Sequence, residues 1–246
     1  MDEPDFHRAL FRPGTLVDIG AHAGGMTLAL ADLPWTRILA FEPLPTAYAR
    51  LEAAVRARWG HIPAHVVLRC EALGEASGHL ALEVPVVGGV AQEQWASVAK
   101  DYAALQADDP RIDAVRRYDV PVLPLDALEL DDVTAIKLDV EGAEEEVLRG
   151  AAATLRRCRP VLSVEIEERH RRGSTRRVPD LLALCGYEGW YEFYGDWRPI
   201  EHFDPIAMQR ASSSPASFEV SDPYVFCFYF TPPDRHADLA TLARLP

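Results

Sequence analysis

Cysteine is scarce in this sequence, and no two cysteines stand close together. The chain has four, at positions 70, 158, 185 and 227, and none belongs to a CxxC pair. This spacing argues against a zinc site and against a disulfide framework. Reduced thiols are typical of a cytoplasmic protein, which is the location we expect. The N-terminal stretch MDEPDFHRALF has no apolar core, which argues against a secretory signal peptide.

Long hydrophobic runs and an excess of positive charge are also missing. No run of about eighteen apolar residues occurs, so a membrane-spanning helix is not expected. The formal net charge is −13, which repels phosphate backbones and argues against nucleic acid as a partner. Hydrophobic residues make up 48% of the 246 positions, enough for a sizeable core. The length predicts one domain over residues 1–246.

Short apolar segments alternate with segments of helical periodicity. The predicted strands cover residues 15–19, 37–42, 64–70, 134–140 and 160–166, and the predicted helices cover residues 24–33, 45–59 and 143–157. This alternation predicts an α/β fold with a mostly parallel sheet and helices on both faces.

Two regions depart from this alternation. Residues 78–118 form an irregular insertion, with an extra strand predicted over 78–85 and a weak helix around 98–105. Such a long connection in a compact domain is often a binding loop. The C-terminal segment, residues 187–246, is rich in aromatic residues and proline, with strands predicted over 187–194 and 224–230.

The stretch LVDIGAHAGG, residues 16–25, joins the first predicted strand to the first predicted helix. Gly20 and Gly24 let the backbone approach a ligand closely, and the helix N-terminus offers unpaired N–H groups. Dinucleotide-binding turns read GxGxxG and hold a pyrophosphate. Here the carboxylate of Asp18 precedes the glycines, where it would repel a pyrophosphate and attract an ammonium group. The turn predicts a ligand that joins a nucleoside to an amino acid, S-adenosylmethionine, with His22 contacting it mainly through its backbone.

Acidic residues end further predicted strands. Glu42 closes the second strand, where an acid accepts hydrogen bonds from ribose hydroxyls; the alternative is a solvated strand-end acid. Asp139 ends the fourth strand beside the expected cofactor, and Glu141 begins the next helix. Glutamates at a helix N-terminus also stabilise the helix itself, which is sufficient to explain Glu145 and Glu146.

Six ordered segments carry a resemblance to a known family. They are VDIGAHAGGMT, FEP, EALGEASG, VPVLPLDAL, KLDVEGAEEEVLRGA and RPVLSVEI. In this order and at this approximate spacing, the chain resembles the FkbM-type methyltransferases over roughly residues 16–166. A weaker similarity continues in LLALCGYE and in the terminal aromatic strand.

The resemblance implies a Rossmann-like class I methyltransferase fold. Its sheet would have seven mostly parallel strands, with an antiparallel C-terminal strand and helices on both faces. The implied activity uses S-adenosylmethionine and methylates a hydroxyl group on a sugar or natural product. The resemblance also implies that Asp18, Gly20 and Glu42 bind the cofactor and that Glu71 lies near the adenine. The remaining cofactor candidates are Ala21, His22, Gly24, Pro43, Ala72 and Asp139.

Methyl transfer to oxygen requires alignment of the reacting atoms and removal of the hydroxyl proton. The candidates for the base are Asp139, Glu141, Glu165, Glu167 and His170. Asp139 and Glu165 end neighbouring strands, so together they could hold Mg²⁺; alternatively they have ordinary backbone or arginine partners. His170 is the best base that needs no metal.

The expected partner is a small hydroxylated acceptor. Residues 78–118 and 187–246 are expected to shape the pocket that binds it. The basic run RHRRGSTRR, residues 169–177, would hold an anionic or glycosylated acceptor or would be a solvated loop. The tail aromatics Trp190, Tyr191, Tyr194 and Trp197 would stack on the acceptor, pack in the core or support a homo-oligomer. Two further hypotheses remain open, a non-catalytic binding module and a nicotinamide-dependent oxidoreductase, as does methylation of nitrogen or carbon.

Overall fold

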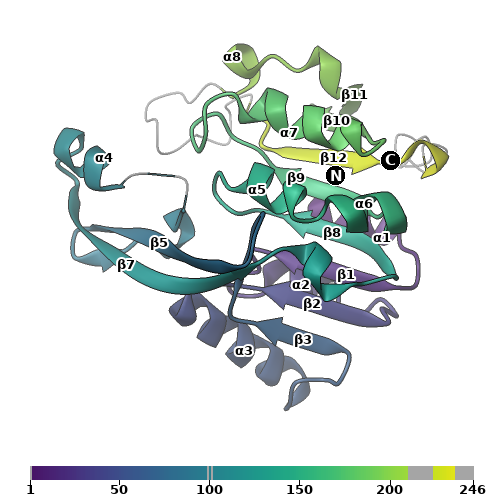
Figure 1. Cartoon of the computed structure of the whole chain (residues 1–246), viewed down its shortest axis with the longest axis horizontal. Helices are drawn as coiled ribbons and strands as arrows, with labels where there is room; N and C mark the ends of the chain where they lie inside the picture. The colour runs from purple at the N-terminus through teal and green to yellow at the C-terminus, as the bar shows by residue number, and fades with distance from the viewer. Residues whose placement is uncertain (1, 99, 101, 210–223, 236–246) are drawn as a thin grey trace.

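The computed structural model describes residues 2–98, 100, 102–209 and 224–235. Its centre is an eight-stranded sheet in the order β11-β10-β12-β9-β8-β1-β2-β3 (Figure 1). The strands are β1 Thr15–Ile19, β2 Arg37–Phe41, β3 Val66–Arg69, β8 Val133–Leu138, β9 Val161–Glu165, β10 Glu188–Phe193, β11 Asp196–Pro199 and β12 Cys227–Thr231. No helix among the described residues is both long and apolar enough to cross a membrane.

Alternating side chains divide the core between the two faces of this sheet. In β2, Leu39 and Phe41 pack with helices α5 Glu144–Arg149, α6 Ala152–Cys158 and α7 Ser174–Leu184. Ile38 and Ala40 instead pack with helices α1 Glu3–Ala9, α2 Gly25–Leu30 and α3 Pro45–Trp59. Because both faces are covered, the central strands are mostly apolar, and the charged residues Asp18 and Lys137 are buried within them. The α/β fold with helices on both faces is confirmed.

The C-terminal strand enters the sheet as the resemblance implies. β12 lies between β9 and β10 and is antiparallel to both. The expected count of seven strands is exceeded by one, because β10 continues through a tight turn into β11. The rest of the predicted C-terminal segment, residues 210–223 and 236–246, lies outside the described residues.

The insertion predicted to be irregular is mostly a second sheet, which corrects the sequence prediction. Long strands β5 Gly78–Val87 and β7 Ile112–Leu123 pair along ten residues, and β4 Ala72–Leu73 and β6 Val90–Ala91 flank them. Together β5 and β7 make a ribbon that extends away from the main sheet, with helix α4 Tyr102–Asp108 near its tip (Figure 1). The charged residues of β7 concealed the strand, because most of them face solvent.

The helix predicted over residues 143–157 is also interrupted. It divides into α5 and α6 at Gly150, where a Cβ atom would lie 1.9 Å from the carbonyl oxygen of Gly74. The short helix α8 Pro205–Met208 and four 3-10 turns, Glu93–Trp95, Leu125–Leu128, Ile200–His202 and Pro233–Arg235, complete the described elements.

Candidate active site

The carboxyl ends of the parallel strands β1, β2, β8 and β9 border a cavity of about 300 Å³. This is the edge of an open α/β sheet at which ligands bind. Seven of the ten predicted cofactor residues line it: Gly20, His22, Glu42, Pro43, Glu71, Ala72 and Asp139. Ala21, Gly24 and Asp18 lie behind this lining.

The turn after β1 is built on a close backbone approach. Gly20 has a φ of +77°, and a Cβ atom there would lie 1.8 Å from the carbonyl oxygen of Asp139. The neighbouring N–H groups of Gly20 and Ala21 both donate to the carbonyl of Phe41. Gly24 supports the turn differently, because a Cβ atom there would press on the side chain of Leu51. These glycines therefore bring the ends of β1, β2 and β8 together around the cavity.

Glu42 is the central acidic group of this cavity. Its two carboxylate oxygens accept hydrogen bonds of 2.8 Å from the backbone N–H groups of His22 and Leu44. Burial raises the pKa of Glu42, and these two hydrogen bonds oppose that rise. A carboxylate accepts about four hydrogen bonds. Glu42 can therefore brace the turn and still accept from a ligand's hydroxyl groups.

One side of the cavity is apolar. Phe41 comes from β2 of the main sheet, Leu73 from β4 of the second sheet, and Leu80 and Leu82 from the β5–β7 ribbon. Glu71 lies at the same side and is held by Arg69, with 2.5 Å between Arg69 Nε and Glu71 Oε2. The two ribbon leucines were not predicted to line the site, although their period-two spacing in β5 was a usable signal.

Asp18 occupies a different position from the one expected. Its side chain is fully buried, and Oδ2 accepts a hydrogen bond of 2.6 Å from the Thr27 hydroxyl. Lys137 Nζ lies 3.9 Å from Asp18 Oδ1, and it donates to the carbonyl of Gly20 at 2.8 Å. In this geometry Asp18 supports the turn through Lys137 and Thr27, and it does not line the cavity.

Lys137 contacts both Asp18 and Asp139. It was not predicted to be a site residue. Burial alone would lower the pKa of Lys137, but the carboxylates of Asp139, Asp18 and Glu3 outweigh burial and raise it. The ammonium group is therefore charged, and its Nζ lies 3.4 Å from Asp139 Oδ2. The available signal was the period-two spacing of Lys137 and Asp139, which places both on one face of the strand end.

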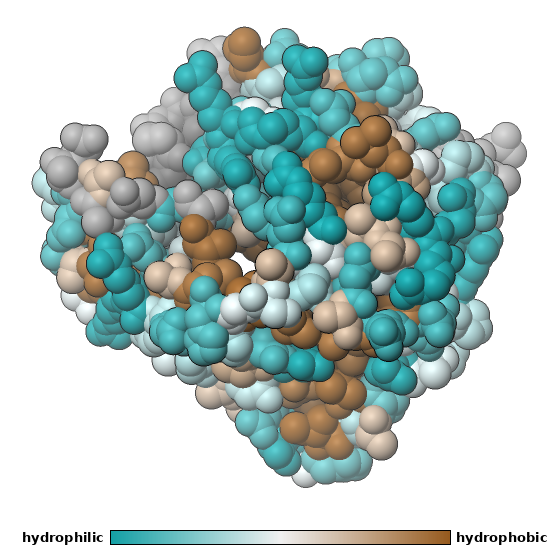
Figure 2. Space-filling model, in the orientation of Figure 1, coloured by the Kyte–Doolittle hydropathy of each residue, from teal (hydrophilic) through white to brown (hydrophobic). Residues whose placement is uncertain are grey.

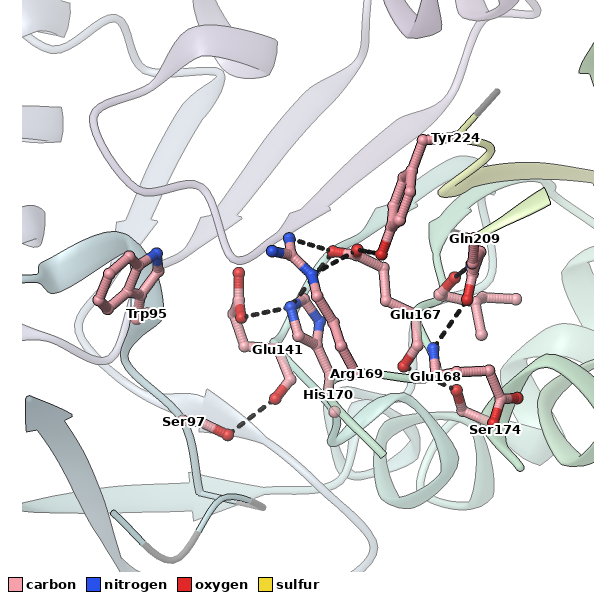
Figure 3. Close-up of polar contacts among 12 residues, drawn as sticks. Trp95, Ser97, Glu141, Glu167, Glu168, Arg169, His170, Ser174, Gln209 and Tyr224 are labelled. Atoms are coloured by element: carbon pink, nitrogen blue, oxygen red, sulfur yellow. Dashed lines mark hydrogen bonds and ion pairs between the residues drawn. The ribbon is translucent and has the colours of Figure 1, made fainter. Parts of the chain in front are cut away.

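Glu141 and His170, far apart in the sequence, meet at the end of the cavity (Figure 3). His170 Nε2 lies 3.0 Å from Glu141 Oε2, and Lys100 Nζ lies 2.8 Å from the same oxygen. Ser97 donates to the Glu141 carbonyl at 2.7 Å. Burial alone would raise the pKa of Glu141, but its contacts with His170 and Lys100 outweigh burial and lower it. Glu141 is therefore an ionised partner for the imidazole.

Glu167 contacts the same nitrogen of His170 as Glu141 does. Its Oε1 lies 3.2 Å from His170 Nε2, and Arg169 donates to both of its oxygens. The Tyr224 hydroxyl also donates to Glu167 (Figure 3). Burial would raise the pKa of Glu167, but the hydrogen bond from Arg169 and the nearby imidazole lower it. Arg169, Tyr224 and His170 together make four contacts with this carboxylate, so it positions His170 and is a poor base.

The predicted Mg²⁺ site at Asp139 and Glu165 does not fit this geometry. The described ligand atoms that converge within 4.8 Å belong to Glu141, Glu165 and His170, while Asp139 faces Lys137. Burial raises the pKa of Glu165 well above its ordinary range, and the Asp139 carboxylate adds to this rise. Mg²⁺ prefers ionised oxygen ligands. A protonated Glu165 and a Glu141 already paired with Lys100 are a poor donor set, and we derive no step through a metal ion.

The basic run after β9 is largely structural. Arg169 binds Glu167, Arg171 lies 2.7 Å from Glu146 and Arg177 lies 2.6 Å from Glu145. Arg171 and Arg177 join the loop and α7 to α5, whereas Arg169 pairs within the loop itself. The interpretation of the run as a clamp for an anionic acceptor is therefore not supported for these three side chains.

The sheet order and the cavity at its carboxyl edge define a Rossmann-like fold of the class I methyltransferase type. The methyltransferase FkbM domain matches residues 18–188, and the chain belongs to this family. A similar solved structure is methyltransferase FkbM from Methylobacillus flagellatus KT, with 17% identity and a TM-score of 0.54. The match covers 93% of this chain and 50% of that one, so this chain spans half the length of that relative.

Two other solved structures show weaker similarity. Precorrin-6y C5,15-methyltransferase from Geobacter metallireducens GS-15 is 12% identical, with a TM-score of 0.48 and coverage of 93% of this chain and 85% of that chain. A SAM-dependent O-methyltransferase from Thermotoga maritima is 12% identical, with a TM-score of 0.44 and coverage of 94% and 64%. No functional conclusion is taken from either. The search of curated proteins returned no match.

Proposed function

We propose that this protein transfers the methyl group of S-adenosylmethionine to a hydroxyl oxygen of a small molecule. The observation that carries the proposal is the placement of Glu42. It is a buried acid at the end of β2, on the wall of the cavity, with acceptor capacity left for the two ribose hydroxyls. Leu80 and Leu82 would provide an apolar surface for the adenine, and Asp139, which lines the same cavity, would receive the ammonium group.

The acceptor hydroxyl is proposed to meet His170. If the N–H at Nε2 donates to Glu141 or Glu167, Nδ1 is the proton-accepting nitrogen. When bound, S-adenosylmethionine supplies an electrophilic methyl group: the O–C bond forms as the C–S bond breaks, and the electron pair stays on sulfur. His170 takes the hydroxyl proton. Glu141 and Glu167 hold the ring and stabilise its charged form.

Calorimetric titration with S-adenosylmethionine and S-adenosylhomocysteine tests the cofactor site. We expect the wild type to bind both, and Glu42→Ala to bind about 10- to 100-fold more weakly, because hydrogen bonds to charged groups contribute about 1.5–3 kcal/mol. Glu42→Gln keeps one acceptor oxygen and should lose less.

The matched control is Glu52→Ala, which removes a carboxylate on α3 that pairs with Arg56 outside the cavity. It should bind like the wild type. A folded wild type that binds neither compound would exclude the proposed function, and nicotinamide cofactors would then be titrated in the same way.

Removal of divalent ions should leave methyl transfer unchanged. Lys100 and Lys137 already neutralise Glu141 and Asp139, so the chain supplies the positive charge at this site. The measurement compares radiolabelled methyl transfer, to an acceptor found by screening hydroxylated compounds, with and without EDTA. A loss of activity that Mg²⁺ restores would contradict this expectation.

A further inference from the structure

A second cavity, of about 400 Å³, lies beside the cofactor cavity. The tip of the β5–β7 ribbon and α4 form one wall, and the loop after β9 forms the other. In Figure 2 a hollow bordered by hydrophobic residues lies between the ribbon and the main body of the protein. The described lining consists of Val87, Trp95, Lys100, Tyr102, Leu105, Asp109, Arg111, Ile112, Arg169 and His170.

One segment of chain separates the two cavities. Gln94, Ala96 and Val98 line the cofactor cavity, whereas Trp95 and Lys100 line the second one. The side of the partition nearest the sheet is the contact between Glu141, which lines the first cavity, and His170, which lines the second. A molecule in the second cavity can therefore reach His170, whose partner Glu141 lines the cavity of the proposed methyl donor.

The lining of the second cavity is mainly apolar, and its cationic side chains are paired with carboxylates. Val87, Trp95, Tyr102, Leu105 and Ile112 contribute most of its hydrophobic surface. Each lining cation is ion-paired with a carboxylate, in the pairs Lys100–Glu141, Arg111–Asp109 and Arg169–Glu167. A phosphorylated or nucleotide-linked acceptor would have to break these pairs, at a cost in desolvation and lost charge pairing.

The turn that carries Trp95 is hydrogen-bonded to α4. The Tyr102 hydroxyl donates to the Trp95 carbonyl at 2.6 Å, which joins α4 to the turn that carries the indole. Figure 3 shows Trp95 across from Glu141, Arg169 and His170. A half-buried indole and a guanidinium group on the lining of one cavity offer surfaces on which an aromatic or alicyclic ring can stack.

We infer that the second cavity binds the acceptor, and that the acceptor is an uncharged molecule with an apolar ring system whose hydroxyl group points at His170. The inference rests on the proposed function and narrows its acceptor class. It assigns Trp95, Tyr102 and Leu105 to acceptor specificity and disfavours free sugars and nucleotide-linked sugars.

The test titrates three named probes into the protein in the presence of S-adenosylhomocysteine. 2-Naphthol represents the inferred class, methyl α-glucoside a neutral sugar, and UDP-glucose an anionic one. We expect 2-naphthol alone to bind the wild type. Trp95→Ala should weaken that binding about tenfold or more, because the aromatic contact and its apolar area are lost.

Leu105→Asp is the second variant, since its side chain is 44% exposed and tolerates a charge without unfolding the protein. It should also weaken 2-naphthol binding, while Leu184→Asp, on the exposed surface of α7 at 76%, should not. Equal binding of 2-naphthol by all variants, no binding by the wild type, or tighter binding of either sugar would each overturn the inference. Loss of S-adenosylhomocysteine binding by the wild type would overturn the proposed function instead, so the two failures are distinguishable.

Discussion

Replacing His170 with alanine is expected to lower kcat for methyl transfer by about 10²- to 10⁴-fold, the usual contribution of a general base. The affinity for S-adenosylhomocysteine should stay nearly unchanged, because His170 lines the second cavity and not the cofactor cavity. The physical reason is the placement of the imidazole, which is buried with its Nε2 atom within 3.2 Å of carboxylate oxygens of both Glu141 and Glu167. These carboxylates stabilise the imidazolium ion that forms when the hydroxyl proton is taken.

The pH–rate profile separates a base from a positioning residue. The pH dependence of the wild-type rate should change shape in His170→Ala if the imidazole is the base. His79→Ala is the matched control, because His79 is exposed on the ribbon beside Asp119. An unchanged kcat in His170→Ala, or an unchanged profile shape, would show that another group takes the proton.

Replacing Lys137 with methionine is expected to destabilise the fold by about 3–5 kcal/mol, the cost typical of breaking a buried ion pair from one side. The substitution leaves the carboxylate of Asp18 fully buried without its nearest cation, and it removes the hydrogen bond to the Gly20 carbonyl. Methionine has a similar length, so the loss is chiefly electrostatic. Urea denaturation followed by circular dichroism measures the change in the free energy of unfolding.

A double-mutant cycle identifies the cause of this loss. Asp18→Asn combined with Lys137→Met removes both charges, and it should cost clearly less than the sum of the single substitutions. If the loss in the free energy of unfolding of the double variant equals the sum of the single losses, Asp18 and Lys137 do not interact. The lysine would then act only through Gly20 and Asp139. Arg56→Met, on the exposed face of α3, provides the baseline for loss of a surface cation.

Most of the main sheet could be predicted from the sequence. The strands at residues 15–19 and 37–42 and the helix at 45–59 appear within one residue of their predicted bounds. Their signal is local, because apolar periodicity and the helix-ending glycine at position 60 are properties of neighbouring residues. The strand β7 was missed for the opposite reason. Its exposed charges match a loop, and its structure depends on pairing with β5.

The residues of the candidate site show the same difference between what local sequence predicts and what depends on tertiary contacts. Gly20, Glu42 and Asp139 could be placed at the cavity from the sequence, because a residue at the carboxyl end of a parallel strand reaches the same edge as its neighbours. Asp18 could not be placed correctly. Whether a strand-end acid faces a ligand or a buried lysine depends on the face of the strand and on the residues packed against that face.

The α/β fold, the glycine turn and the row of acids at one sheet edge can be predicted from the sequence, since each follows from local periodicity or strand order. The partners of those acids depend on tertiary contacts. The fold pairs Glu141 with His170 and Lys100, places Arg169 and Tyr224 against Glu167, and brings the ribbon over the edge to form the second cavity. These pairings join residues that are distant in the chain, and burial sets their charge. No local pattern encodes either property.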